Sequence, residues 1–177
     1  MANVVALASG ATHGITKAFR DRIELVAGYG VAGDAHYGAT VMHRSRRAKF
    51  PDMANLRQVH LIQASLYQEL EDKGFEQKPG SLGENIALSG LDLLALPKGT
   101  RLTFPSGAEI ELTGLRNPCS QLNGVAPGLM DALIGRDAAG ELVRKGGVMA
   151  VVLTGGEVRC GDAVAVKPGT DGALQPV

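Results

Sequence analysis

Short apolar runs alternate with turns that contain glycine or proline along most of the chain. Runs such as "VVALASG" at 4–10 and "AEIELTGL" at 108–115 contain β-branched or alternating apolar positions and end at a turn residue. This pattern is typical of short β-strands. It predicts strands at 4–10, 22–30, 57–63, 84–90, 100–107, 108–115, 147–156 and 162–169, with "PSG" at 105–107 closing a hairpin.

Helical periodicity is confined to two segments. Residues 64–74 carry three apolar side chains at helical spacing and end at Gly74, while residues 126–135 have Pro127 in their first turn. Strands and helices do not alternate as the βαβ units of a doubly wound sheet would require. We therefore expect an all-β or β-rich fold, either a barrel or a sandwich, with a few short helices.

The length of 177 residues fits a single domain, and no repeat or linker divides it. The 24 glycines are spread without a period and indicate many tight turns. The last residues, "PGTDGALQPV" at 168–177, predict a loose C-terminal tail. Basic and acidic residues are equal in number, 18 of each, which argues against bulk binding to nucleic acid.

The N-terminus, "MANVVALASGATHG", lacks the features of a signal peptide, and no apolar run approaches the roughly 20 residues that span a membrane. The two cysteines, at 119 and 160, do not make the disulfide framework of a small secreted protein. The sequence thus predicts a cytoplasmic protein in a reducing setting.

The segment "LRNPCSQL" at 115–122 places a cysteine behind a rigid step. Pro118 fixes its own φ and favours an extended Asn117, so Cys119 is presented at a stiff corner. Arg116 and a helix start directly after the cysteine would favour thiolate over thiol. Two interpretations stay open from this segment alone: a functional thiol, or a small buried apolar residue.

The second cysteine, Cys160, lies between two predicted strands with no polar cluster beyond Arg159, and we interpret it as structural. A redox pair with Cys119 has no spacing signature behind it. A zinc site is disfavoured too, since no pair among the cysteines and the four histidines has CxxC or HxxxH spacing.

Two glycine-rich segments carry polar residues that turn formation alone does not explain. "GYGVAGDAHYG" at 28–38 surrounds Asp34 and His36 with glycines, but it lacks GxxxxGK[ST] and is weak as a nucleotide motif. "PGSLGENIALSG" at 79–90 sets a carboxylate and an amide, Glu84–Asn85, at the mouth of an apolar strand.

A basic run, "HRSRRAKFPD" at 43–52, has two interpretations. It is either a solvated surface or a flap that attracts an anionic ligand. Nucleic-acid binding through residues 43–49 would rest on this run alone, against a neutral total charge.

Five segments together resemble the MOSC domain, named for the C-terminal domain of molybdenum-cofactor sulfurase. In order they are "GVAGDAHYG", "RQVHLI", "GSLGENIALSGLDLLALPKGTRL", "AEIELTGLRNPC" and "GVMAVVLTGGEVRCGD". They run from about residue 28 to residue 166, so the resemblance covers most of the chain.

The resemblance implies a β-barrel that binds the molybdenum cofactor (molybdopterin), a pterin dithiolene with a terminal phosphate. The signature cysteine of the family falls on Cys119. In the sulfurases this cysteine handles the sulfur destined for the metal, and in related reductases of N-hydroxylated compounds it ligates molybdenum. We therefore expect Cys119 to act in sulfur transfer or in reduction, as sulfur carrier or as molybdenum ligand.

The same resemblance assigns further residues to the cofactor site. Those that would neutralise the phosphate are Arg57, Arg116 and Lys17, and those expected around the metal are His36, His60 and Asn117. The family's remaining motif positions are Asp34, Glu84 and Asn85.

The chain also departs from the larger members of the family. It has no aminotransferase-like domain, so no pyridoxal phosphate is expected, and it has neither an N-terminal β-barrel nor iron–sulfur cysteines. Sulfur or electrons would come from a partner protein, and we expect no nucleic-acid or membrane partner. An alternative of another class is a non-catalytic barrel that binds a small anion or a protein.

Overall fold

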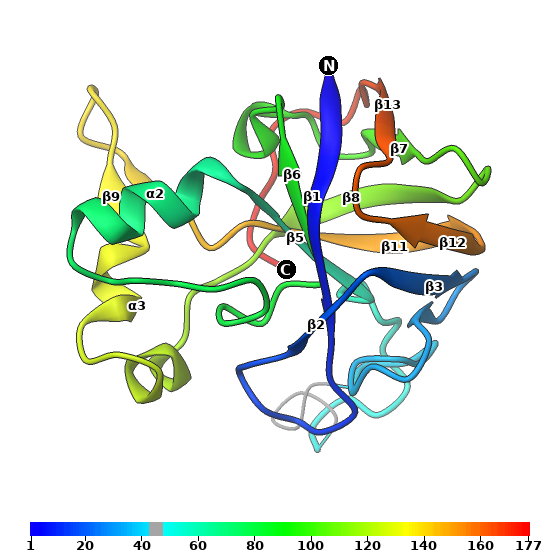
Figure 1. The fold of residues 1–177 in the computed structure, drawn as a ribbon, viewed down its shortest axis with the longest axis horizontal. Helices are drawn as coiled ribbons and strands as arrows, with labels where there is room; N and C mark the ends of the chain where they lie inside the picture. Colours follow the sequence, from blue (N-terminus) through cyan, green and yellow to red (C-terminus); the bar gives the residue numbers. More distant parts are fainter. Residues whose placement is uncertain (43–47) are drawn as a thin grey trace.

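The computed structural model describes residues 1–42 and 48–177. Its centre is a closed barrel of seven strands (Figure 1). Each strand pairs with its neighbour around the barrel, and the pairing of β13 with β1 closes the ring. Around the barrel the order is β1 (Ala2–Ser9), β13 (Ala163–Lys167), β7 (Arg101–Thr103), β8 (Glu109–Leu115), β11 (Val148–Thr154), β5 (Val59–Gln63) and β6 (Ile86–Ser89).

Shorter strands extend this barrel. β2 (Ala18–Arg20) pairs with β1, and a separate three-stranded sheet contains β12 (Gly156–Arg159), β3 (Arg22–Val26) and β4 (Gly30–Val31). The remaining elements are the hairpin β9 (Ile134–Arg136) and β10 (Leu142–Arg144), the α-helices α2 (Ser65–Asp72) and α3 (Leu129–Ala132), and the 3₁₀ helices η1 (Leu93–Ala95) and η2 (Ser120–Gly124).

The predicted β-rich fold is confirmed, and each of the eight predicted strand segments contains a strand. The segment 22–30 contains β3 and the first residue of β4, because the chain turns after Val26 and the two strands then pair antiparallel. One βαβ unit occurs after all: β5 and β6 are parallel, with α2 between them. The predicted helix at 126–135 is reduced to the four residues of α3.

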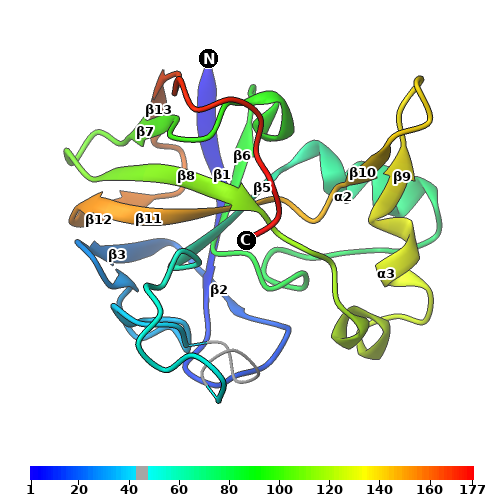
Figure 2. The same ribbon diagram turned by 180° about the vertical axis from the view of Figure 1, so that it is seen from behind.

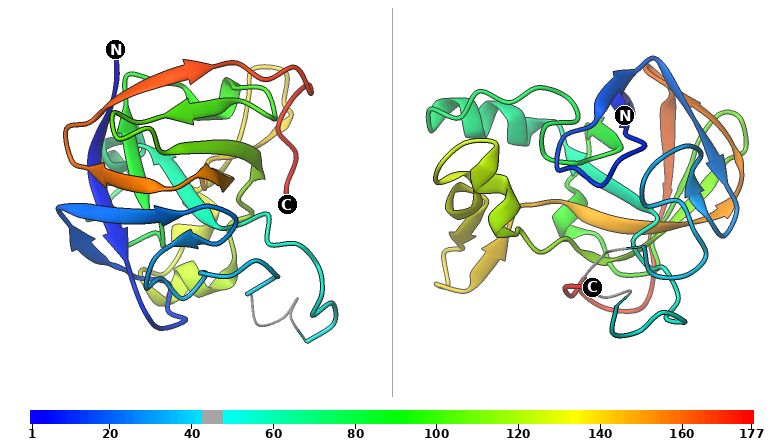
Figure 3. Two further views of the ribbon diagram at one scale, coloured as in Figure 1. Left: turned by 90° about the vertical axis from the view of Figure 1, so that its right-hand side faces the viewer. Right: turned by 90° about the horizontal axis from the view of Figure 1, so that it is seen from below.

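Two apolar clusters explain the arrangement. The barrel interior is filled by valine, leucine, isoleucine and alanine from its strands, with Leu61 and Ile86 fully excluded from solvent. Because side chains alternate along a strand, the neighbouring Ile62 faces outward and packs against Leu66, Leu70 and Leu122 in the second cluster. This second cluster is the core of a helical lobe formed by α2, η2, α3 and β9–β10, which lies to one side of the barrel (Figure 3).

The C-terminal residues are held in place, which corrects the predicted loose tail. Leu174 is 5% exposed and belongs to the barrel core. Leu115 at the end of β8 donates its N–H to Gln175 O (2.8 Å) and accepts from Val177 N (3.2 Å). The segment thus crosses the end of β8 (Figure 2), because one buried leucine and two backbone hydrogen bonds fix it there.

Within the described part of the chain, every helix is too short or too polar to pass through a lipid bilayer.

Candidate functional site

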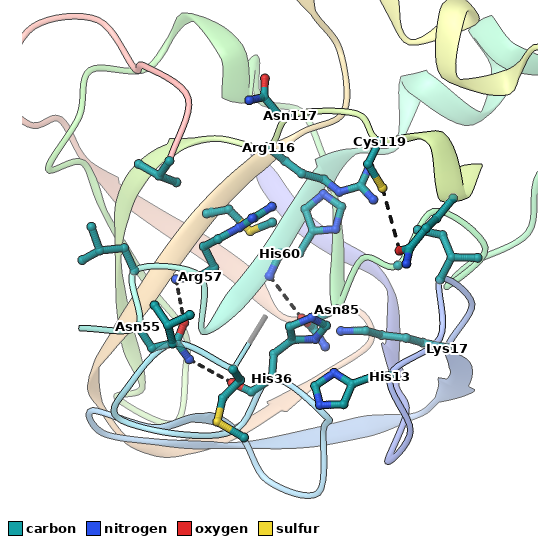
Figure 4. Close-up of a pocket in the computed structure, with 18 of the residues that line it drawn as sticks. His13, Lys17, His36, Asn55, Arg57, His60, Asn85, Arg116, Asn117 and Cys119 are labelled. Atoms are coloured by element: carbon teal, nitrogen blue, oxygen red, sulfur yellow. Dashed lines mark hydrogen bonds between the residues drawn. The ribbon is translucent and has the colours of Figure 1, made fainter. Parts of the chain in front are cut away.

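A cavity of about 290 Å³ opens where the barrel meets the helical lobe and the loop segments 13–17, 36–42 and 53–57 (Figure 4). Its wall combines basic and amide side chains with one thiol on one part and apolar side chains on another. The polar set is His13, Lys17, His36, Asn55, Arg57, His60, Asn85, Arg116, Asn117, Cys119 and Gln121, and the apolar set includes Ile15, Val41, Met42, Met53, Leu56 and Met149.

Cys119 stands at the corner that the sequence predicted. Its backbone is extended (φ −127°, ψ 161°), and its carbonyl accepts the N–H of Leu122 at 3.0 Å as η2 begins. Its side chain is partly exposed, and Sγ donates to Gln121 Oε1 at 3.9 Å. The thiol therefore faces the cavity from the junction of barrel and lobe, and the alternative of a buried apolar cysteine does not describe it.

Arg116 is a buried cation in the cavity wall. It is 6% exposed, and its Nη1 has no hydrogen-bond partner among the described residues. Burial lowers the pKa of the guanidinium, and the nearby Cys119 and Glu84 oppose that effect. A buried charge with an unsatisfied donor is costly. An anion placed in the cavity would remove that cost.

Asp34 connects the glycine loop to the cavity wall, although it does not line the cavity itself. Its fully buried carboxylate accepts from Lys17 Nζ at 2.9 Å, from Asn85 Nδ2 at 3.0 Å and from Gly10 N at 3.2 Å. His36 adds its backbone N at 3.0 Å and its ring Nδ1 at 3.2 Å. Burial alone would raise the pKa of Asp34, but the hydrogen bonds from His36 and the charge of Lys17 hold it far below its ordinary value.

Lys17 contributes less free charge to the cavity than the resemblance implied. Its side chain is 4% exposed and its ammonium is paired with Asp34. Burial lowers the pKa of Lys17, against the attraction of Asp34. The two charges compensate each other, whereas Arg116, whose Nη1 has no partner among the described residues, and Arg57 also line the cavity.

His60 and Asn85, which line the cavity with Cys119, are connected by a hydrogen bond. Asn85 Oδ1 accepts the backbone N–H of His60 at 3.1 Å, and Asn85 Nδ2 donates to Ala8 O at 3.1 Å. Since Gly146 O can only accept, His60 Nε2 carries the proton in their 2.7 Å hydrogen bond. Burial, followed by the charge of Arg116, holds the pKa of His60 well below 6.5, so its ring is neutral.

Glu84 lies outside the cavity wall, which corrects its expected place in the site. One carboxylate oxygen accepts from Tyr67 Oη and Gly80 N, both at 2.5 Å, and the other accepts from Leu82 N at 3.0 Å. Burial raises the pKa of Glu84 despite these hydrogen bonds. Its role is to close the turn that precedes β6.

Arg57 and Asn117 lie in the cavity wall as expected. No sequence pattern indicates Asn55, which is 4% exposed and organises this part of the wall. Its Nδ2 donates to His36 O and to Gly38 O, both at 2.9 Å, and its Oδ1 accepts the backbone N–H of Arg57 at 3.0 Å. Asparagine in a loop segment is common, so only the fold shows that it ties two loops together.

Three other cavity residues were also not anticipated. His13 packs edge-on against His36, with ring centroids 5.7 Å apart. Met42 and Met53 form part of the apolar wall. Their sequence positions show no periodicity, because they come from irregular loops rather than from strands.

The remaining candidates from the sequence lie elsewhere. Cys160 is exposed and its Sγ donates to Arg20 O at 3.6 Å; both cysteines are free thiols. Residues 43–47 of the basic run lie outside the described residues. In the part of the chain that the structure covers, no group of three or more His, Cys, Asp or Glu side chains could hold a metal ion.

Comparison with known proteins identifies the family. The MOSC domain profile matches residues 36–165, and YuaD of Bacillus subtilis (strain 168), whose assigned name provisionally places it in metal–sulfur cluster biosynthesis, is 33% identical over 150 residues, 77% of this chain and 76% of YuaD. The chain belongs to the MOSC domain family. The expected resemblance is thereby confirmed.

Solved structures agree with this fold. The crystal structure of B. subtilis YuaD superposes with a TM-score of 0.78 at 27% identity, covering 96% of this chain and 98% of YuaD. YiiM from Geobacillus stearothermophilus gives a TM-score of 0.69 at 18% identity, over 99% of this chain and 80% of that one. YiiM from Escherichia coli gives 0.63 at 17% identity, over 98% and 73%.

Proposed function

We propose that the cavity binds the molybdenum cofactor, with Cys119 as the sulfur group that either carries sulfur to the metal or ligates it. The observation that carries this proposal is the buried Arg116, whose Nη1 points to no partner in the described chain. A phosphorylated ligand would supply the missing negative charge and oxygen acceptors, for which guanidinium is well suited.

The residues present fit this group. Arg116 and Arg57 would hold the phosphate, and the amide of Asn117 would offer hydrogen bonds to a pterin ring, whereas the amide of Asn85 is engaged by Ala8, Asp34 and His60. Cys119 supplies the thiol among the described residues that line the cavity, and a dithiolene brings two sulfur ligands of its own. When bound, the cofactor would supply a molybdenum centre capable of two-electron chemistry or sulfur exchange.

The remaining groups of the wall would define the environment of that centre. Neutral His60 is fixed by its hydrogen bond to Gly146 O and cannot reorient without breaking it. The apolar part of the wall, with Met42, Met53 and Leu56, would exclude water from one side of a bound ligand. We further propose a reducing, cytoplasmic setting, because Cys119 must stay a free thiol for either role.

The test is to express the protein in cells that make the cofactor and purify it without air. Molybdenum and released pterin are then measured for the wild type and for Cys119→Ala. We expect both components in the wild type and a large loss of molybdenum in the variant. Wild-type protein free of both would contradict the proposal, and would favour the non-catalytic barrel as the alternative.

Turnover assays and mass spectrometry together distinguish the two proposed roles of the Cys119 thiol. A reductase would turn over an N-hydroxylated compound with an electron donor, whereas a sulfur carrier would show a persulfide on Cys119 by mass spectrometry and no turnover. In either case a partner protein would supply the electrons or the sulfur. The name of YuaD, which refers to metal–sulfur clusters, supports sulfur handling within the family.

A further inference from the structure

The Asp34–His36 pair has a geometry that cofactor binding does not require. Asp34 Oδ1 accepts both the backbone N–H of His36 and its ring Nδ1, at 3.0 and 3.2 Å. Because Asp34 is ionised and can only accept, the proton of a neutral His36 ring must lie on Nδ1. The other ring nitrogen, Nε2, then carries a lone pair.

The position of the His36 ring gives Nε2 access to both water and the cavity. Its side chain is 30% exposed and forms part of the cavity wall, beside His13, Lys17 and Asn85 (Figure 4). Partial exposure allows exchange of protons with water, while the Asp34 contact fixes the tautomer and the ring orientation. An imidazole in this arrangement is suited to general acid–base catalysis.

The other basic groups of the wall are less suited to this role. His60 is 5% exposed, and its Nε2–H is committed to Gly146 O. The ammonium of Lys17 is committed to Asp34, and the guanidinium of Arg116 does not give up a proton in the working range of pH. His36 and the exposed His13 are the cavity histidines that combine access to water with access to the cavity, and for His36 the contact with Asp34 fixes the tautomer.

We infer that His36, positioned by Asp34, donates protons to a substrate bound in the cavity. This inference rests on the proposed function and deepens its reductive form. In the reduction of an N-hydroxylated amidine, two electrons from a low-potential donor and two protons cleave the N–O bond. The oxygen leaves as water and the nitrogen is left as the amidine. His36 Nε2 would first take up a proton from solvent, and the imidazolium, held by ionised Asp34, would give that proton to the departing oxygen and return to the neutral Nδ1–H form. The second proton would come from solvent.

The first test needs no cofactor. ¹⁵N–¹H correlation spectra of the protein without cofactor report which ring nitrogen of each histidine is protonated. We expect the Nδ1–H tautomer for neutral His36 and the Nε2–H tautomer for His60, and loss of the His36 preference in Asp34→Asn. A wild-type His36 in the Nε2–H form would overturn the inference.

The second test uses cofactor-loaded protein, reduced methyl viologen as donor and benzamidoxime as substrate. We expect His36→Ala to keep its molybdenum and pterin within about twofold of wild type. Turnover should fall by about 10²- to 10⁴-fold, the range for removal of a general acid, and added imidazole should restore at least tenfold of that loss. His36→Gln should show the same loss without rescue.

Each other result has a distinct meaning. Loaded His36→Ala with wild-type turnover, a variant that loses the cofactor, or loaded wild type that leaves benzamidoxime unreduced would each overturn the proton-donor role. Wild type that contains no cofactor would instead contradict the proposed function itself. Imidazole rescue separates a chemical role from a structural one, because a rearranged cavity would not respond to a small added base.

Discussion

Lys17 and Asp34 form an ion pair of 2.9 Å whose two side chains are 4% and 0% exposed. The pair connects the loop before β2 to the glycine loop after β4, and Asn85 joins both through the same carboxylate. Three segments that are distant in sequence thus meet at one buried charge.

Breaking this pair from one side should be strongly destabilising. Lys17→Met leaves a buried carboxylate without its counter-charge, and Asp34→Asn leaves a buried ammonium; each should lower the free energy of unfolding by about 3–5 kcal/mol. The double variant should lose clearly less than the sum of the two, as urea unfolding would show. Strict additivity would mean that the two charges are not coupled.

Acid should destabilise the protein through His60. Its folded pKa lies well below 6.5, so below that pH the unfolded chain binds a proton that the folded chain does not. The stability that this group contributes is complete above pH 6.5 and declines as the pH falls towards its folded pKa, by up to about 1.4 kcal/mol per pH unit.

The variant His60→Gln should remove that part of the slope of unfolding free energy between pH 6.5 and 5. Asp34, whose pKa is also depressed, contributes only below its ordinary value of 3.8, and so leaves this window unaffected. Equal slopes for wild type and variant, measured by urea unfolding at several pH values, would show that His60 is protonated in the fold.

Alanine substitution at two glycines distinguishes the cost of backbone strain from the cost of steric overlap. Gly80 (φ +88°) and Gly107 (φ +87°) have the same left-handed conformation. A methyl group at Gly107 would meet nothing within 4 Å, whereas at Gly80 it would overlap the carbonyl oxygen of Lys17. Gly107→Ala should therefore cost about 1–2 kcal/mol from strain alone.

Gly80→Ala should cost several kcal/mol more than this control and displace the loop that carries Lys17. Thermal unfolding of the two variants gives the difference directly. Similar costs for both would show that the loop before β2 moves freely away from residue 80.

Much of the barrel could be predicted because its signals are local. Strands such as β8 and β11 combine alternation or a β-branched run with a glycine boundary, and each occupies nearly the predicted residues. The strands that were missed are short; β2 has three exposed residues and no apolar face to produce a pattern. It exists because β1 offers it backbone partners.

The site was predictable to the extent that its residues are neighbours in sequence. Arg116 and Cys119 are three positions apart, so the sequence itself placed a cation near the thiol. The pairing of Lys17 with Asp34, and the role of Asn55, depend on loops brought together by the fold. Periodicity carries no information about such contacts.

Arg116 should lower the stability of the cofactor-free protein and be required for cofactor binding. Replacing a buried, incompletely satisfied guanidinium by an apolar side chain of similar length should stabilise the protein without cofactor by about 1–2 kcal/mol. Arg116→Met should at the same time lose cofactor binding. The control Arg101→Met, on the barrel surface in two exposed ion pairs, should change stability by no more than about 0.5 kcal/mol. Destabilisation by Arg116→Met in urea unfolding would mean that its charge is compensated within the chain.

The most direct measurement is X-ray diffraction at the molybdenum absorption edge, on crystals of protein made in cofactor-producing cells and kept from air. We expect one anomalous peak in the cavity beside Cys119 Sγ, with phosphate density against Arg116. The absence of any molybdenum peak, or a peak elsewhere on the molecule with Arg116 unliganded, would contradict the claim that this cavity is a cofactor site.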